Sequence, residues 1–165
     1  MKKNINIFFI CLYLFFAASA SSQVSQGNYS CIFIDGNGAV TDKGFYLQIL
    51  PENLSMIDRN SKLREKNLGT AEIIAFNTWD AGVVSAELLY SFDVKVIKNK
   101  YYENTDSAKF PHKFIMNRKT YALKIKNIFT KETLNYQCKE LNKGMSFEDL
   151  ILERIVELQE LIDLK

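Results

Sequence analysis

The 165-residue sequence lacks the residues and motifs from which most catalytic and metal sites are built. It has one histidine, His112, which has no cysteine or carboxylate partner at the spacing of metal ligands. A nucleophile elbow, a P-loop, an HExxH helix and a CxxC pair are all absent from the sequence. We therefore interpret His112 as an ordinary surface or core residue. The protein is expected to be non-enzymatic, with no metal ion and no cofactor.

The N-terminus has the three-part pattern of a secretory signal peptide. Lys2 and Lys3 precede an almost unbroken apolar run over residues 5–17, and residues 18–20 (Ala-Ser-Ala) have the spacing of a cleavage site. The run is short for a transmembrane helix, and polar residues follow it at once. We predict that residues 1–20 are cleaved and that the mature protein is periplasmic or secreted, with no stable membrane insertion.

The predicted mature chain also lacks a charge excess of either sign. Without Lys2 and Lys3, 19 basic residues remain against 19 acidic residues. Residues 145–165 hold six acidic residues against Arg154 and Lys165, which leaves a small positive excess on residues 21–144. An excess of this size is ordinary for a solvated surface, so we expect no nucleic-acid partner.

Cysteine is scarce, and its positions are informative. Cys11 lies in the predicted signal peptide, so Cys31 and Cys138 are the two cysteines of the mature chain. Both belong to a Tyr-x-Cys stretch with strand-like alternation. In an exported protein such a pair favours a disulfide, with two free buried thiols as the alternative. A bond closing a loop of about 100 residues stabilises a fold by roughly 4–5 kcal/mol. We predict that it joins the first strand to the last.

Most of the mature chain is typical of short β-strands separated by turns. Apolar residues at every second position from Leu88 to Val96 give the clearest strand, although its start (residues 83–89) also fits a helical turn. Residues 35–38 (Asp-Gly-Asn-Gly) predict a hairpin turn, and residues 99–109 predict a loop. The other strands are expected at residues 29–34, 45–50, 54–58, 70–77, 112–116, 120–126 and 134–138.

About eight short strands joined by tight turns predict an all-β antiparallel meander in residues 21–144. A meander of this size forms either a small barrel or a β-sandwich. The expected disulfide favours the barrel because it places the first strand beside the last. The outline resembles that of lipocalin-type barrels, and Gly27-x-Tyr29 stands where such barrels have Gly-x-Trp. The tryptophan is absent here, so the resemblance implies an architecture and no function.

Residues 145–165 have a helical periodicity instead. Ser146, followed by Glu148 and Asp149, is typical of a capped helix start. Apolar residues then recur on one face, with glutamates on the opposite face. We predict one C-terminal amphipathic α-helix over residues 147–161, packed on the β domain. Pairing of two such helices in a homodimer, and contact with a membrane surface, are the alternatives.

Two sets of residues are candidates for binding. Inward-facing aromatic residues either line a cavity for a small apolar or amphipathic ligand or fill a solid core: Tyr29, Phe33, Tyr90, Phe92 and Tyr121. Basic residues with aromatic neighbours either bind an anionic partner or only protect strand edges from pairing: Lys95, Lys98, Lys100, Tyr101, Tyr102, Arg118 and Lys119.

These patterns favour an exported, disulfide-stapled interaction module of the bacterial cell envelope. The bacterial source is suggested by a composition rich in lysine, asparagine and isoleucine. Its expected partner is an unknown protein or envelope component, and we expect a monomer or a helix-mediated homodimer. The alternative is a lipocalin-like protein that holds a small apolar or amphipathic ligand inside the barrel.

Overall fold

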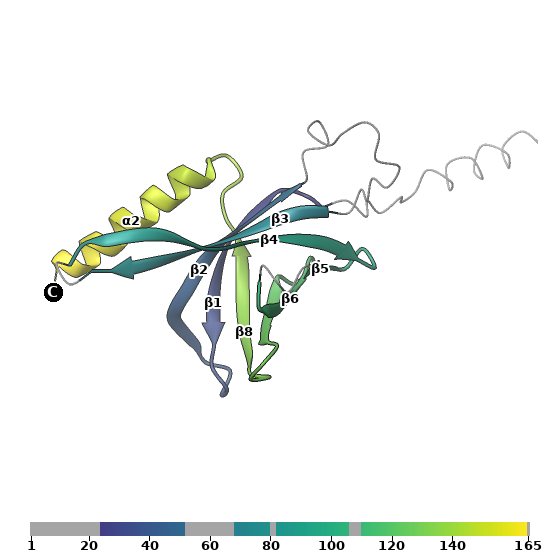
Figure 1. Ribbon diagram of the computed structural model, residues 1–165. Helices are drawn as coiled ribbons and strands as arrows, with labels where there is room; N and C mark the ends of the chain where they lie inside the picture. The colour runs from purple at the N-terminus through teal and green to yellow at the C-terminus, as the bar shows by residue number, and fades with distance from the viewer. Residues whose placement is uncertain (1–23, 52–67, 80–81, 106–109, 165) are drawn as a thin grey trace, which may run out of the picture.

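A computed structural model describes residues 24–51, 68–79, 82–105 and 110–164 of the chain. Eight antiparallel strands follow one another around a closed barrel, and one helix comes after them (Figure 1). The elements are β1 (Gly27–Ile34), β2 (Val40–Pro51), β3 (Leu68–Thr78), β4 (Val84–Ile97), β5 (Tyr101–Asn104), β6 (His112–Asn117), β7 (Ala122–Asn127), β8 (Thr133–Glu140) and α2 (Phe147–Asp163). The predicted all-β barrel with a C-terminal helix is confirmed, and the sandwich alternative is wrong.

The barrel closes through a disulfide at the seam between its first and last strands. β1 pairs with both β2 and β8, and Cys31 lies directly opposite Cys138 in the β1–β8 ladder. Their sulfur atoms are 2.04 Å apart, and the bond links positions 107 residues apart in the sequence. Both cysteines are buried. The predicted disulfide and its role in joining the first strand to the last are confirmed.

Side chains from all eight strands form one buried core cluster. Every second residue of a strand points inward, so Leu47 and Ile49 of β2 are fully buried between half-buried neighbours. At the centre, Phe92 stacks on Phe110 with ring centroids 4.1 Å apart, and it meets Phe114 edge-on at 5.3 Å. Rings in contact at these distances add to the stabilisation from burial alone.

Two of the strands extend beyond the barrel as a long hairpin. β3 has 11 residues and β4 has 14, and Figure 1 shows their paired ends reaching out beside α2. We call residues 74–79 and 82–89 the β3–β4 arm. Its turn uses Gly82 at φ 74°, whose N–H donates to the carbonyl oxygen of Trp79 at 2.8 Å. A glycine adopts this left-handed backbone without a steric penalty.

A β-bulge marks the place where the arm leaves the barrel. Ile73 pairs with Tyr90 but Ile74 pairs with Leu88, so Leu89 has no partner of its own in β3. The extra residue breaks the alternation of β4. Leu88 is consequently 52% exposed, and its predicted place on the buried face is wrong. The alternative of a helical turn at residues 83–89 is also wrong, because this segment is part of β4.

Five further expectations have different outcomes. Residues 101–104 form β5 rather than a loop, and β2 begins at Val40, five residues earlier than expected. The predicted turn at residues 35–38 is confirmed, since Asp35 Oδ1 accepts the backbone N–H groups of Asn37 and Ala39. The predicted signal peptide and the predicted strand at residues 54–58 lie outside the described residues.

Helix α2 lies along the arm (Figure 1). Ser146 caps it, accepting the N–H of Asp149 at 3.1 Å, as its sequence predicts. In the first turns of α2, the side chains of Phe147 and Leu150 are buried. Near its other end, the side-chain amide of Gln159 joins the helix to the arm: Nε2 donates to the Gly82 carbonyl at 2.9 Å, and Oε1 accepts the Val84 N–H at 3.0 Å.

Candidate interaction surface

The one histidine of the chain is packed among aromatic rings. The ring of His112 lies 5.1 Å from that of Phe110 and 6.2 Å from that of Tyr90, measured between centroids. In the part of the chain that the structure describes, no three histidine, cysteine or carboxylate side chains come together in a group suited to a metal ion.

The five aromatic residues predicted to line a ligand cavity do not form one wall. Tyr29 packs on Tyr121 at 5.4 Å, and Phe92 stacks within the core. Phe33 packs against Tyr136 at 5.6 Å. Tyr90 meets Phe110 edge-on at 4.9 Å. The five residues thus fall into three ring clusters: Tyr29 with Tyr121, Tyr90 and Phe92 around Phe110, and Phe33 with Tyr136. Tyr29 and Phe92 are buried in the core, and Tyr90 and Tyr121 pack against it.

Phe33 borders an apolar hollow at the barrel. Together with Phe45, Leu134 and Tyr136 it lines an open cleft of about 300 Å³. The rings of Phe45 and Tyr136 are 4.9 Å apart and only half buried. Burial raises the pKa of the Tyr136 hydroxyl above its ordinary value. This cleft has room for a small apolar group at the wall between β1, β2 and β8.

The predicted basic surface is brought together only in part. The β4–β5 and β6–β7 turns are joined by a hydrogen bond from the Arg118 N–H to the Lys100 carbonyl at 2.9 Å. Lys100, Arg118 and Lys119 border a wide, shallow hollow of about 930 Å³. Lys98 belongs to the same β4–β5 turn, and the Lys100 ammonium lies 5.3 Å from the ring of Tyr101.

Two members of the predicted basic surface lie elsewhere. Tyr102 is 1% exposed, and its hydroxyl is 2.9 Å from that of Ser25, so its place on a binding surface is wrong. The Arg118 guanidinium covers its ring at 5.1 Å. Lys95 is half buried in the β4–β5 ladder opposite Glu103. Residues 101–104 were predicted to be a loop, but they form β5. Alternate residues of a strand point to opposite faces, and Tyr102 points into the barrel, which explains its burial.

The large exposed apolar side chains gather in a different place, on the arm and α2. Among the described residues, ten large apolar side chains are exposed, and eight of them belong to these two elements. We call these eight the arm–helix surface: Trp79, Val83, Leu88, Leu89, Leu152, Val156, Leu161 and Leu164. The other two are Ile32 and Phe129. Scattered exposed apolar residues are normal, but their concentration on two neighbouring elements makes this surface the candidate for an interaction site.

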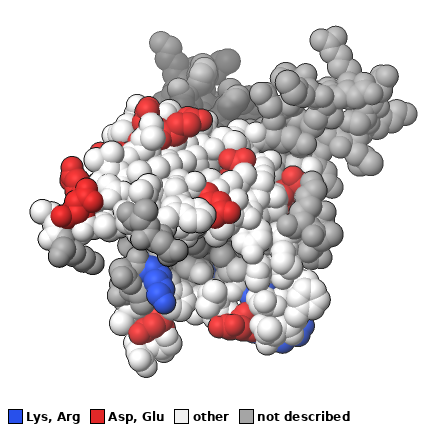
Figure 2. Space-filling model, turned by 60° about the vertical axis from the view of Figure 1, so that its left-hand side comes forward, with Lys and Arg blue, Asp and Glu red and all other residues white. Residues whose placement is uncertain are grey.

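Acidic groups surround this surface. Residues 146–164 contain six acidic residues and one basic residue, Arg154, which forms an ion pair with Glu157 at 2.9 Å. Figure 2 shows one side of the molecule, with acidic groups spread over its upper part and both basic and acidic groups lower down. The surface therefore combines apolar side chains with a negative charge.

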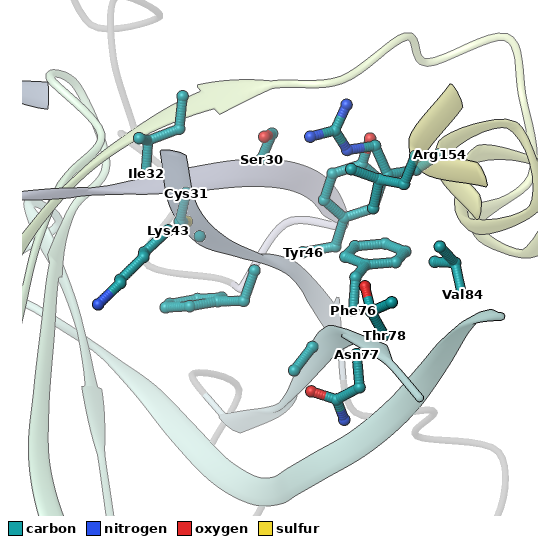
Figure 3. Close-up of a pocket in the computed structure, with 14 residues that line it drawn as sticks. Ser30, Cys31, Ile32, Lys43, Tyr46, Phe76, Asn77, Thr78, Val84 and Arg154 are labelled. Carbon is teal, nitrogen blue, oxygen red and sulfur yellow. The ribbon is translucent and has the colours of Figure 1, made fainter. Parts of the chain in front are cut away.

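A groove separates α2 from the barrel wall on the other flank of the helix (Figure 3). It has a volume of about 670 Å³, and its lining includes Tyr46, Phe76, Val84, Arg154 and Leu158. The rings of Tyr46 and Phe76 meet edge-on at 4.9 Å. Burial raises the pKa of the Tyr46 hydroxyl, and the charge of Arg154 opposes this rise. The groove thus lies between α2 and the aromatic side chains of Tyr46 and Phe76, and this part of the barrel surface is not covered by the helix.

No protein-family model, curated protein or solved structure matches this chain. Within the described residues, no helix is long and apolar enough to cross a membrane. Function therefore has to be argued from the geometry. The sequence analysis did not identify the arm–helix surface. The signal for it was the Leu88-Leu89 doublet, which breaks the alternation of β4 where the bulge occurs.

Proposed function

We propose that this protein is an exported, non-enzymatic interaction module of the bacterial cell envelope and that the arm–helix surface is its contact site. The observation that carries this proposal is the concentration of exposed apolar side chains on the arm and α2. Leu88 and Leu152 are 52% and 59% exposed although the barrel beside them has a filled core. Folding leaves this apolar area uncovered, and a partner protein would bury it.

The disulfide supports an extracytoplasmic location. Structural disulfides persist in oxidising compartments and are rare in the cytosol. The Cys31–Cys138 bond is buried at the seam of the barrel, as a structural bond would be. The signal-peptide pattern of residues 1–20 adds to this argument from the sequence alone.

A ligand inside the barrel receives less support. The predicted lining residues Tyr29 and Phe92 are core residues, and Phe92 is in stacking contact with Phe110. An eight-stranded barrel is only just wide enough for side chains to fill it. The cleft at Phe33, Phe45 and Tyr136 favours a small apolar ligand on the barrel wall as the second candidate function.

Site-specific photo-cross-linking in the exporting host tests the first proposal. A photoreactive phenylalanine analogue is placed at Leu88 or at Leu152 of the full-length protein. The matched controls place it at Phe129, which is 77% exposed on the β7–β8 turn, and at Lys124 on the barrel. We expect both arm–helix positions, and neither control, to form an adduct with the same protein. Adducts of equal yield at all four positions would contradict the proposal.

Native mass spectrometry separates the two candidate functions. Protein purified without denaturation from the exporting host should have the bare mass of the mature, oxidised chain. A reproducible extra mass of a small molecule that is lost in Tyr136→Ala would instead favour the ligand-binding function. The disulfide gives an internal check, since the oxidised chain is two hydrogen atoms lighter than the reduced chain.

A further inference from the structure

The outer edge of β4 is open along the arm. β4 pairs with β3 from Val84 to Lys95, but it pairs with β5 only over residues 94–97. Within residues 24–51, 68–79, 82–105 and 110–164, no strand pairs with the other edge of β4 between residues 84 and 92. An unpaired strand edge is a template for pairing with another chain.

Two hydrogen bonds identify the backbone groups on the open side. The Val84 N–H donates to Gln159 Oε1 at 3.0 Å, and the Asp93 carbonyl accepts the Thr105 N–H at 2.9 Å. Both bonds lie on the edge away from β3. Alternate residues of a strand direct their N–H and C=O groups to the same edge. The backbone groups of Ala86 therefore point to the same edge as those of Val84, and the groups of Ser91 point to the same edge as those of Asp93. These two residues therefore present backbone hydrogen-bonding groups to the open side.

This edge lacks most of the protection that open edges usually have. Lysine, proline and inward-pointing charges are the common devices against edge-to-edge pairing. Residues 84–92 (Val-Ser-Ala-Glu-Leu-Leu-Tyr-Ser-Phe) contain no lysine and no proline, and Glu87 is their one charged residue. Among the described residues, the bulge at Leu88 and Leu89 and the cover that Gln159 of α2 gives to the Val84 N–H are the devices present. The edge is thus suited to receive another strand.

A row of the helix runs beside the same edge. Leu152, Val156 and Gln159 are spaced four and three residues apart, so they share one face of α2. Gln159 contacts Val84 at the tip of the arm. With a rise of 1.5 Å per residue, Leu152 lies about 10 Å back along the helix from Gln159, about the length of three strand residues. Leu152 and Val156, 59% and 56% exposed, thus flank the open edge near Leu88.

We propose that an extended basic segment of a partner protein binds by adding one strand to the open edge of β4. Its backbone would pair with Ala86 and Ser91, and its alternate apolar side chains would contact Leu88, Leu152 and Val156. This inference rests on the proposed function and specifies how the arm–helix surface binds.

Charge complementarity selects a basic partner over a second copy of the chain. α2 carries six acidic residues and one basic residue, and Glu87 lies on the arm, so the described elements that border the edge carry a net negative charge. Pairing β4 with β4 of another copy would bring two acidic helices side by side, which like-charge repulsion opposes. A segment with lysines at alternate positions meets the same groups favourably, and this attraction weakens at high salt.

The test uses the ¹⁵N-labelled mature protein and a synthetic probe, acetyl-Lys-Val-Lys-Val-Lys-Val-Lys-amide. We expect amide signals of Ala86 and Ser91 to shift and their hydrogen exchange to slow when the peptide is added. The matched probe with glutamate in place of lysine should bind at least about tenfold more weakly, since its charges have the wrong sign. Equal binding of the two probes would overturn the inference.

Two variants place the bound peptide. The double variant Leu152→Ser/Val156→Ser should weaken the lysine probe about tenfold by removing apolar contacts. Phe129→Ser is the matched control, because Phe129 is 77% exposed on the β7–β8 turn, outside the arm–helix surface. Ala86→Pro removes a donor on the open edge and leaves the β3 ladder intact, so it should abolish binding without unfolding the arm.

The remaining outcomes are distinct. Slowed exchange at Ala86 and Ser91 that grows with protein concentration alone, together with a dimer mass, would replace the basic partner by a second copy and overturn the proposal. Peptide-induced shifts confined to the Lys100 and Arg118 turns would also overturn it. If the probe does not bind while cross-links from Leu88 and Leu152 persist, the strand-addition mechanism fails and the interaction module stands.

Discussion

β4 passes through two regions of the molecule and is buried differently in each. In the barrel, Val94 is fully buried, and the strand pairs with β3 on one edge and β5 on the other. In the arm, Leu88 and Leu89 are about half exposed, and β3 is the one strand among the described residues that pairs with β4 there. The bulge between Ile73 and Ile74 separates these two regimes. One strand can therefore stabilise a fold in one half and leave apolar surface for a partner in the other.

The barrel holds most of the interactions that stabilise the fold, whereas the arm and α2 expose the side chains proposed to contact a partner. The barrel has the disulfide, the stacked rings and a filled interior. The arm has exposed apolar residues and few ties to the rest of the fold, among them the two hydrogen bonds of Gln159. Changes in the barrel should therefore lower stability, and changes on the arm–helix surface should lower binding while leaving stability nearly unchanged.

The largest loss of stability is expected on removing the disulfide. The double variant Cys31→Ala/Cys138→Ala should lower the free energy of unfolding by about 4–5 kcal/mol, because the unfolded chain regains the freedom of a loop of about 100 residues. Urea unfolding followed by circular dichroism measures the change. An unchanged midpoint, with the same dependence on urea, would show that the seam does not need the bond.

A loss of similar size is expected at the centre of the core. Phe92→Ala should cost about 3–5 kcal/mol, because it leaves a cavity between Phe110 and Phe114. Trp79→Ala is the matched change on the arm, where the ring is 63% exposed. It should cost less than about 1 kcal/mol. Equal losses for the two variants would remove the distinction between the barrel and the arm.

Alkaline pH should weaken the barrel through its buried tyrosines. Burial raises the pKa of Tyr29 and of Tyr136 above the ordinary value of about 10. Since the folded-state pKa exceeds the unfolded one, the neutral ring contributes stability that is complete below about pH 10. This contribution is lost as the pH rises through the folded-state pKa. Urea unfolding at increasing pH should show the loss, and it should be smaller in Tyr136→Phe.

A smaller effect is expected where the arm meets the helix. Gln159→Ala removes two hydrogen bonds, to Gly82 and Val84, and should lower the free energy of unfolding by about 1–2 kcal/mol. Amide hydrogen exchange should speed up in the arm and stay unchanged in β1 and β8. Equal acceleration in both regions would mean that the arm and barrel unfold as one unit.

The smallest effect on stability is expected on the outer row of α2. Leu152→Ser and Val156→Ser remove side chains that are more than half exposed, so each should change the free energy of unfolding by less than about 0.5 kcal/mol. The same variants should lose the cross-link expected from Leu88. A large loss of stability would show that these leucine and valine side chains pack within the fold and do not form a surface for a partner protein.

The sequence predicted the parts of the fold that depend on local pattern and on the cysteine pair. Alternation predicted most strands, Ser146 predicted the start of α2, and Cys31 with Cys138 predicted closure of the barrel. The site could not be predicted in the same way. Whether Leu88 faces inward depends on a bulge that is defined by pairing with Ile73 and Ile74, and pairing between strands is not local in the sequence.

Hydrogen exchange of single amides along β4 in the free protein tests the central claim most directly. The account predicts slow exchange at Ser85 and Glu87, whose N–H groups face β3, and fast exchange at Ala86 and Ser91, whose N–H groups face the open edge. Val94 and Lys95 should exchange slowly, because both edges of β4 are paired there. Uniformly slow exchange from Ser85 to Ile97 in the monomer would mean that the edge is already covered, which would contradict the account.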